Sequence, residues 1–177
     1  PQFLDEYCMH YSIGLEIIQP VSDDGHSISS SRIRQLIQDG FVRRANFELG
    51  SVFGFIATVI HGAGRGKELN FPTANVVPVE KNQLMPKPGV YFTRGRIIGL
   101  QAYGMCNFGT RPTFDEHELV LEIHFFHDEL DNLYGKEIRV EFLERIRDEK
   151  KFPSPEELKS QLQKDKLRCL ELQGKYE

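Results

Sequence analysis

A glycine-rich loop with two cations is the stretch whose residue types point most directly to chemistry. Residues 62–75 read Gly-Ala-Gly-Arg-Gly-Lys-Glu-Leu-Asn-Phe-Pro-Thr-Ala-Asn. Glycines let backbone N–H groups approach phosphate oxygens, and Arg65 or Lys67 would offset the phosphate charge. The Thr73 hydroxyl and the Asn75 carbonyl are hard oxygen donors of the kind that suit Mg²⁺. A phosphate-binding loop next to a magnesium site is the minimum that a protein needs to bind ATP with its metal ion.

The loop does not follow the common phosphate-binding motifs. A Walker A loop has four residues between its first glycine and the Gly-Lys pair, followed by Ser or Thr. Here Gly62 is one residue too close to Gly66-Lys67, and Glu68 occupies the position of the hydroxyl residue. The dinucleotide fingerprint fails as well, because Lys67 stands where its third glycine belongs. On composition alone, a flexible hairpin loop with solvated cations remains an alternative interpretation.

A carboxylate stands within an otherwise apolar strand pattern. In residues 119–125, Leu-Val-Leu-Glu-Ile-His-Phe, side chains of a strand would alternate between faces. One face would be wholly apolar, and Glu122 would share the other face with Val120 and His124. Such a carboxylate is a catalytic base or an ordinary solvent-facing residue. His124 and His127 would face opposite ways, so this pattern does not favour a shared metal ion.

Residues 144–153 mix charges of both signs and end on Phe152-Pro153. The charges are too balanced for a nucleic-acid patch, and a solvated linker is the simple interpretation. The functional interpretation is that this segment forms a flap, which presents an aromatic side chain to a flat ligand.

Taken together, these motifs resemble riboflavin kinase, specifically the kinase module of bifunctional bacterial FAD synthetases. The resemblance begins with Gly-x-Gly-Arg-Gly and Leu-x-Phe-Pro-Thr-Ala-Asn. It continues through Asn107-Phe108-Gly109-Thr110-Arg111-Pro112-Thr113-Phe114, Leu121-Glu122-Ile123-His124, Leu133-Tyr134-Gly135 and residues 147–152. Asn70 replaces the glycine that the family usually has, and asparagine tolerates left-handed backbone better than most residues.

The resemblance implies a Mg²⁺-dependent transfer of the γ-phosphate of ATP to the ribityl hydroxyl of riboflavin, giving FMN and ADP. It implies that Glu122 is the general base and that Thr73 and Asn75 bind the metal. The residues implied to bind ATP are Gly62, Gly64, Arg65, Gly66, Lys67, Thr73, Phe125, His127 and Tyr134. Those implied to bind the flavin are Asn107, Arg147, Lys150 and Phe152. A non-catalytic flavin- or nucleotide-binding barrel and a structural docking module remain the alternatives.

The elements that must position these residues change character near Gly50. Beyond it the pattern predicts strands at Val52–His61, Gly89–Ile98, Gln101–Phe108, Glu118–Phe126 and Glu137–Leu143. A run of strands without intervening helices favours an antiparallel barrel or sandwich. The resemblance implies a mainly β fold, a Greek-key barrel, for residues 51–177. Ser154-Pro155-Glu156-Glu157 then predicts a C-terminal helix, with an apolar face of Leu158, Leu162, Leu167, Leu170 and Leu172.

Residues 1–50 have an α/β pattern, with a strand-like stretch at 12–21 and a turn at 23–25. A helix with Ile33, Leu36 and Ile37 on its apolar side would end at Gly40, and a second would run from 42 to 49. Residues 28–34 resemble the closing motif of the adenylyltransferase module of the same enzymes. That module's His-x-Gly-His is missing, and its strands would precede Pro1. We therefore expect a remnant of that module, and a chain that does not convert FMN to FAD.

Composition narrows the class of partner. Acidic residues outnumber basic ones, 26 to 22, and the isoelectric point is near 5.9, so there is no overall positive field to attract nucleic acid or anionic membranes. No apolar run is long enough for a membrane span. Cys8, Cys106 and Cys169 are scattered and indicate a reduced, cytoplasmic protein. We expect a monomer whose partners are ATP and riboflavin or FMN.

Overall fold

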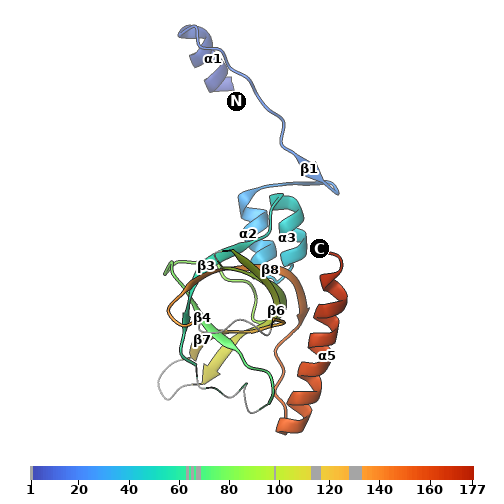
Figure 1. The fold of residues 1–177 in the computed structure, drawn as a ribbon. Helices are drawn as coiled ribbons and strands as arrows, with labels where there is room; N and C mark the ends of the chain where they lie inside the picture. The colour runs from blue at the N-terminus through green and yellow to red at the C-terminus, as the bar shows by residue number, and fades with distance from the viewer. Residues whose placement is uncertain are drawn as a thin grey trace. The chain divides into compact units, whose positions relative to one another are not determined.

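In the computed structural model the chain forms two compact units, Pro1–Ser30 and Ser31–Glu177 (Figure 1). It describes residues 2–62, 64, 66, 69–97, 99–112, 117–127 and 133–177. Arg65, Lys67 and Glu68 of the glycine-rich loop therefore lie outside the described residues.

The first unit contains one helix and one small hairpin. Helix α1 spans Gln2–His10, and strands β1 (Ser22–Asp23) and β2 (His26–Ser27) pair in antiparallel fashion. The strand predicted at residues 12–21 is wrong, because these residues are exposed and the structure assigns no strand to them. Apolar residues at strand-like spacing do not form a strand without a paired neighbour.

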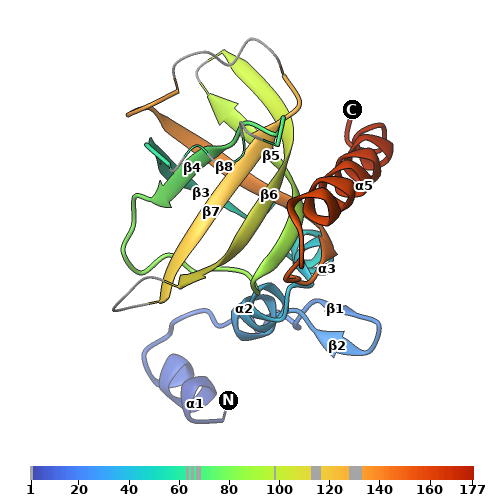
Figure 2. The same ribbon diagram turned by 90° about the horizontal axis from the view of Figure 1, so that it is seen from below.

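The second unit is built on a closed antiparallel barrel, as expected from the sequence. Its strands are β3 (Gly54–Ile60), β4 (Ala74–Pro78), β5 (Gly89–Ile97), β6 (Leu100–Pro112), β7 (His117–Phe125) and β8 (Glu137–Arg147). They follow the order β3-β4-β7-β6-β5-β8 around the barrel, and Figure 2 shows β4, β7 and β6 side by side. Strands β5, β6 and β7 form a meander and β8 returns beside β5, which is a Greek key. The mainly β Greek-key fold is confirmed.

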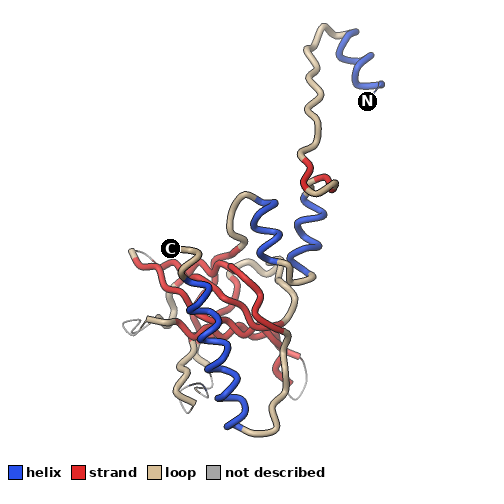
Figure 3. Tube along the Cα trace, turned by 90° about the vertical axis from the view of Figure 1, so that its right-hand side faces the viewer, coloured by secondary structure: helices blue, strands red, loops and turns tan. Residues whose placement is uncertain are grey.

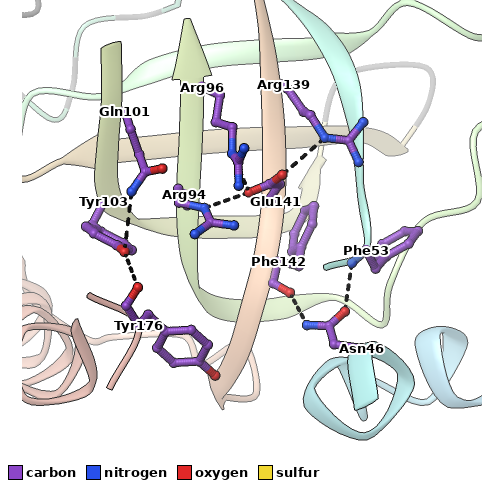
Figure 4. A network of polar contacts seen from close by, with 10 residues as sticks. All are labelled: Asn46, Phe53, Arg94, Arg96, Gln101, Tyr103, Arg139, Glu141, Phe142 and Tyr176. Carbon is purple, nitrogen blue, oxygen red and sulfur yellow. Dashed lines mark hydrogen bonds and ion pairs between the residues drawn. The ribbon is translucent and has the colours of Figure 1, made fainter. Parts of the chain in front are cut away.

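Two short helices, α2 (Ser30–Gln38) and α3 (Val42–Leu49), cover one part of the barrel. Ile37 and Val42 are buried in the same core as the barrel interior. The Asn46 side chain accepts a hydrogen bond from the Phe53 N–H at 2.7 Å and donates one to the Phe142 carbonyl at 2.9 Å (Figure 4). These helices belong to the compact unit Ser31–Glu177. The domain boundary expected near Gly50 stays a prediction.

Helix α5 (Pro155–Gln173) runs along the outside of the barrel (Figure 3). It begins as predicted, with the Ser154 side chain accepting from the Glu157 N–H at 3.2 Å. The predicted apolar face is wrong in part, because Leu167 and Leu170 are 62% and 43% exposed. The face of α5 that packs on the barrel instead follows helical spacing from Leu158 and Leu162 to the buried residues Asp165, Cys169 and Leu172.

Two apolar clusters result from this arrangement. The barrel interior contains Phe55, Ala57, Val59, Val76, Tyr91, Cys106, Phe108, Leu121, Ile123, Ile138, Val140 and Phe142. A second cluster lies between the outer face of the barrel and α5, with Phe71, Phe92, Tyr103, Met105, Leu143, Cys169 and Leu172. The outer face beneath α5 is therefore a second buried layer, in which polar residues are shielded from solvent.

A buried carboxylate on another part of the outer face stabilises the pairing of β5 with β8. Glu141 accepts hydrogen bonds from Arg94 at 2.6 Å, Arg96 at 3.1 Å and Arg139 at 3.2 Å (Figure 4). Arg96 and Arg139 are direct cross-strand partners, and like charges in such a pair repel. Burial alone would raise the pKa of Glu141, but the hydrogen bonds and charges of the arginines lower it overall.

We expect Glu141→Gln to lower the free energy of unfolding by about 2 kcal/mol at neutral pH, measured by urea denaturation. The lowered pKa means that the stabilisation is complete above the ordinary value of 4.5 and is lost as the pH falls through the folded-state pKa. The difference between wild type and variant should therefore shrink below pH 4.5. Arg96→Gln, at a half-exposed partner, should cost less than about 1 kcal/mol. A difference that did not depend on pH would contradict this interpretation.

Candidate active site

Four predicted site residues lie on one line that crosses five strands, with Val90 at the fifth position; the four are Asn75, Glu122, Asn107 and Arg147. Cross-strand pairs join Asn75 of β4 to Glu122 of β7, Glu122 to Asn107 of β6, Asn107 to Val90 of β5, and Val90 to Arg147 of β8. Directly paired residues of an antiparallel sheet present their side chains on the same face. Leu121 and Ile123, the neighbours of Glu122, are buried in the barrel interior, so this line lies on the outer face.

A cavity of about 350 Å³ lies over this line, between the barrel and α5. Its size falls at the lower end of the range for small-molecule sites, about 300–1,000 Å³. Glu122, Asn107 and Arg147 line it from the sheet, and Thr73 and Gly66 line it from the loop before β4. Leu158 and Leu162 of α5 form an apolar wall. The structure thus places the predicted base, one predicted metal ligand and part of the glycine-rich loop at one cavity.

The described glycines of the loop permit close approaches that a side chain would prevent. A Cβ atom at Gly62 would lie 2.0 Å from the Asn75 side-chain nitrogen, and one at Gly66 would lie 2.2 Å from the Phe71 carbonyl oxygen. Gly64 and Asn70 have φ angles of 72° and 62°, in the left-handed region. Asn70, which stands in place of the family's usual glycine, thus has a backbone conformation that asparagine tolerates better than most residues.

The loop is also fixed from the sheet side. The His124 ring, 6% exposed, lies with Nδ1 2.9 Å from the Pro72 carbonyl oxygen, just before Thr73. Burial lowers the pKa of His124, and the Lys166 charge lowers it further, against the opposing effect of the Pro72 hydrogen bond. The prediction that Glu122, His124 and Val120 share one face is confirmed, because all three line the cavity.

The predicted flavin residues gather at the other side of the cavity. Arg147, Lys150 and Phe152 all line it, and both cations lie 5.7 Å from the centre of the Phe152 ring. The segment after β8 approaches β6 closely, since a Cβ atom at Gly109 would lie 1.6 Å from Glu149 Oε1. An aromatic ring held by two cations next to a cavity suits a flat ligand.

Sequence reasoning missed the partner that holds Arg147. Asp165 of α5 is 2% exposed and accepts from Arg147 Nε at 2.9 Å and from Nη2 at 2.8 Å. Gln161 donates to the same carboxylate at 2.8 Å. A signal was present, because Asp165 stands within the apolar stripe of α5 at helical spacing, where an acid needs a buried partner.

The described residues that were predicted to bind the nucleotide or the metal but do not line the cavity are Gly62, Gly64, Asn75, Phe125, His127 and Tyr134. The Phe125 ring packs inward beside Gly95, where a Cβ atom would meet it at 2.6 Å. Tyr134 stacks on His61 with ring centres 4.0 Å apart, next to the start of the glycine-rich loop. His127 is exposed after the end of β7. Their roles stay predictions, as do those of Arg65 and Lys67.

The predicted metal ligands suit a metal shared with phosphate better than a metal held by protein alone. Among the described residues, no group of three or more His, Cys, Asp or Glu side chains could hold an ion. A hydroxyl and an amide oxygen are the donors that Mg²⁺ accepts alongside phosphate oxygens. Asn75 is 6% exposed and sits where Gly62 leaves room for its side chain, so its position is fixed. Thr73, which lines the cavity, and Asn75, the cross-strand neighbour of Glu122, therefore supply oxygen donors of the type that fits a Mg²⁺–nucleotide complex.

The buried thiols take no part in this site. Burial raises the pKa of Cys106, and raises that of Cys169 to about 12. Both thiols therefore stay protonated at neutral pH and are poor nucleophiles. Within the described residues, none of the helices is both long enough and apolar enough to cross a membrane.

The fold is a Greek-key barrel with a cavity on its outer face. A carboxylate and a glycine-rich loop border this cavity, whose size is typical of small-molecule sites. A family model for riboflavin kinase (Flavokinase) matches residues 49–172. The chain therefore belongs to the riboflavin kinase family.

Its relatives include longer, two-activity enzymes. The bifunctional riboflavin kinase/FMN adenylyltransferase of Bacillus subtilis is 37% identical over 160 residues, covering 89% of this chain and 50% of that protein. The Escherichia coli K12 enzyme of the same name is 36% identical over 167 residues, covering 94% and 52%. The chain spans about half the length of these curated relatives.

A solved structure has the same fold. A crystal structure described as a macrolide-efflux protein from Streptococcus pneumoniae superposes with a TM-score of 0.83 at 36% identity. The superposition covers 92% of this chain and 53% of that one.

Proposed function

We propose that this chain is a riboflavin kinase that transfers the γ-phosphate of ATP to the terminal ribityl hydroxyl of riboflavin, giving FMN and ADP. The observation that carries the proposal is the line Asn75–Glu122–Asn107–Val90–Arg147 across the sheet. In this line the Glu122 carboxylate lies between the part of the cavity lined by Thr73 and the part lined by Phe152. Membership of the riboflavin kinase family supports the same reaction.

In the proposed mechanism Glu122 accepts the proton of the ribityl hydroxyl as its oxygen bonds to the γ-phosphorus. The bond from that phosphorus to the bridging oxygen breaks, and ADP leaves with the bond electrons. Phosphoryl transfer needs alignment and charge stabilisation more than covalent help from the protein. Bound Mg²⁺ would supply neutralisation of phosphate charge, and Thr73 and Asn75 would hold it. Phe152 would stack on the isoalloxazine ring, and the wall of α5 would exclude water from the transfer.

A product analysis tests this proposal. Incubation with ATP, Mg²⁺ and riboflavin should release ADP and FMN in equal amounts, identified by chromatography, and ADP release should depend on riboflavin. The alternative of a non-catalytic binding barrel predicts riboflavin binding without ADP. ATP hydrolysis that was independent of riboflavin would contradict the kinase assignment.

We propose further that residues 1–50 derive from the adenylyltransferase module and that this chain does not make FAD. The 167-residue alignment with the E. coli enzyme must include most of residues 1–50, and the sequence has no His-x-Gly-His motif. Incubation with FMN, ATP and Mg²⁺ should therefore yield no FAD. Appearance of FAD and pyrophosphate would overturn this part. A monomeric, cytoplasmic protein stays a prediction.

The metal assignment predicts a selective defect. Thr73→Ala and Asn75→Ala should each weaken Mg·ATP binding by about tenfold or more, because each removes one oxygen donor, and leave riboflavin binding within about twofold. Titration calorimetry with each ligand separates the two effects. Equal losses for both ligands would contradict a role at the metal.

A further inference from the structure

His124 is a buried ring at the cavity that the proposed mechanism does not use. It stands two residues after Glu122 on β7, so both side chains lie on the outer face and line the cavity. Its Nδ1 lies 2.9 Å from the carbonyl oxygen of Pro72. That carbonyl belongs to the peptide bond that leads into Thr73, so the bond to His124 fixes the orientation of the peptide that carries Thr73.

The contacts of the ring determine its tautomer. A carbonyl oxygen can only accept a hydrogen bond, so Nδ1 carries the proton and Nε2 of the neutral ring is an acceptor. Lys166 Nζ of α5 lies 3.5 Å from Nε2. One ring nitrogen is thus directed at the loop and the other at the C-terminal helix.

The ring cannot turn without losing packing as well. Phe71 lies edge-on to it with ring centres 5.1 Å apart, and Phe126 lies edge-on at 5.8 Å. Lys166 Nζ lies 5.6 Å from the centre of the Phe126 ring, which holds the ammonium group in place. The ring is therefore fixed by a donor bond, an acceptor contact and two aromatic neighbours.

The helix that supplies Lys166 also holds the opposite side of the cavity. Asp165, the preceding residue, binds Arg147 at the base of the segment that carries Phe152. Two consecutive residues of α5 thus fix the loop with Thr73, through His124, and the segment with Phe152, through Arg147.

We infer that His124 is a positioning residue that sets the Pro72–Thr73 peptide, and so aims the Thr73 hydroxyl at the Mg·ATP complex, with Lys166 holding the ring in the required tautomer. This inference rests on the proposed function, because it assigns Thr73 to the metal and nucleotide. It gives His124 a role that acts through Thr73 and not through contact with the reacting atoms.

Two substitutions separate positioning from simple packing. His124→Phe keeps a ring of similar shape but removes the donor, whereas His124→Asn can present an amide N–H near the position of Nδ1. We expect the Phe variant to raise KM for Mg·ATP by about tenfold, with KM for riboflavin within about twofold. The Asn variant should recover most of that loss. Lys166→Met should show a weaker defect of the same kind.

Three results would overturn the inference: a Phe variant that matches wild type, equal losses for both substrates, or an Asn variant no better than Phe at equal thermal stability. Calorimetric binding of Mg²⁺ with a non-hydrolysable ATP analogue provides the same comparison without turnover. If wild type bound the analogue but formed no FMN, the proposed function would fail while the test of His124 could still be completed. If the Phe variant did not fold, Lys166→Met would decide, and wild-type affinity for the analogue in that variant would overturn the role.

Discussion

Glu122→Gln should lower kcat by about 1,000-fold while the dissociation constants of riboflavin and Mg·ATP change by less than about twofold. A positioned general base contributes about 10²–10⁴ to the rate. The amide keeps the size of the side chain and its place between Asn75 and Asn107, but it cannot accept the proton of the ribityl hydroxyl. Steady-state rates with ADP detection, combined with flavin fluorescence quenching for binding, separate the two quantities.

A second carboxylate provides the competing assignment. Glu149 also lines the cavity, with its side chain beside Gly109. We expect Glu149→Gln to retain far more activity than Glu122→Gln, because Glu149 lies in an exposed segment outside the line of paired residues. Glu137→Gln, at an exposed position of β8, is the matched control and should behave as wild type. If Glu149→Gln lost more activity than Glu122→Gln, Glu149 and not Glu122 would be the general base.

Asp165→Ala should lower the free energy of unfolding by about 3 kcal/mol and weaken riboflavin binding by about tenfold. Removing one partner of a buried ion pair leaves the other charge uncompensated, which costs about 3–5 kcal/mol. Asp165 is 2% exposed and holds Arg147 through two nitrogens, so Arg147 would lose its fixed position at the cavity. Urea denaturation and riboflavin titration measure the two effects.

The same helix offers a matched control for this substitution. Glu171 pairs with Arg168 at 3.0 Å, and both side chains are more than half exposed. Glu171→Ala should cost less than about 1 kcal/mol and leave riboflavin binding unchanged. If Asp165→Ala destabilised the protein but bound riboflavin as wild type does, Arg147 would have no part in flavin binding.

Local patterns were sufficient for most of the barrel. Strong alternation and turn residues located β3, β5, β6, β7 and β8, because each strand buries one face in the barrel interior. Strand β4 was missed, since Ala74–Pro78 is short and follows a proline-containing turn. The stretch at 12–21 failed for the opposite reason, because its pattern suits a strand but the fold provides no partner for it.

The site was predictable in its residue types but not in its geometry. Thr73, Asn75 and Glu122 were identified from oxygen-donor chemistry and from resemblance, yet the pairing of β4 with β7 is a long-range contact that local patterns do not contain. The same limit applies to Arg147 with Asp165 and to His124 with Pro72. The partners are 18 residues apart in the first pair and 52 residues apart in the second, and they belong to different segments of the chain, so only the fold brings each pair together.

A crystal structure with riboflavin, ADP and Mg²⁺ bound would test the central claim most directly, that one cavity joins flavin and phosphate through Glu122. We predict the isoalloxazine ring against Phe152, the metal at Thr73 and Asn75, and the terminal ribityl oxygen within about 3 Å of the Glu122 carboxylate. Riboflavin bound elsewhere, or a ribityl oxygen beyond the reach of Glu122 even through one water molecule, would contradict it.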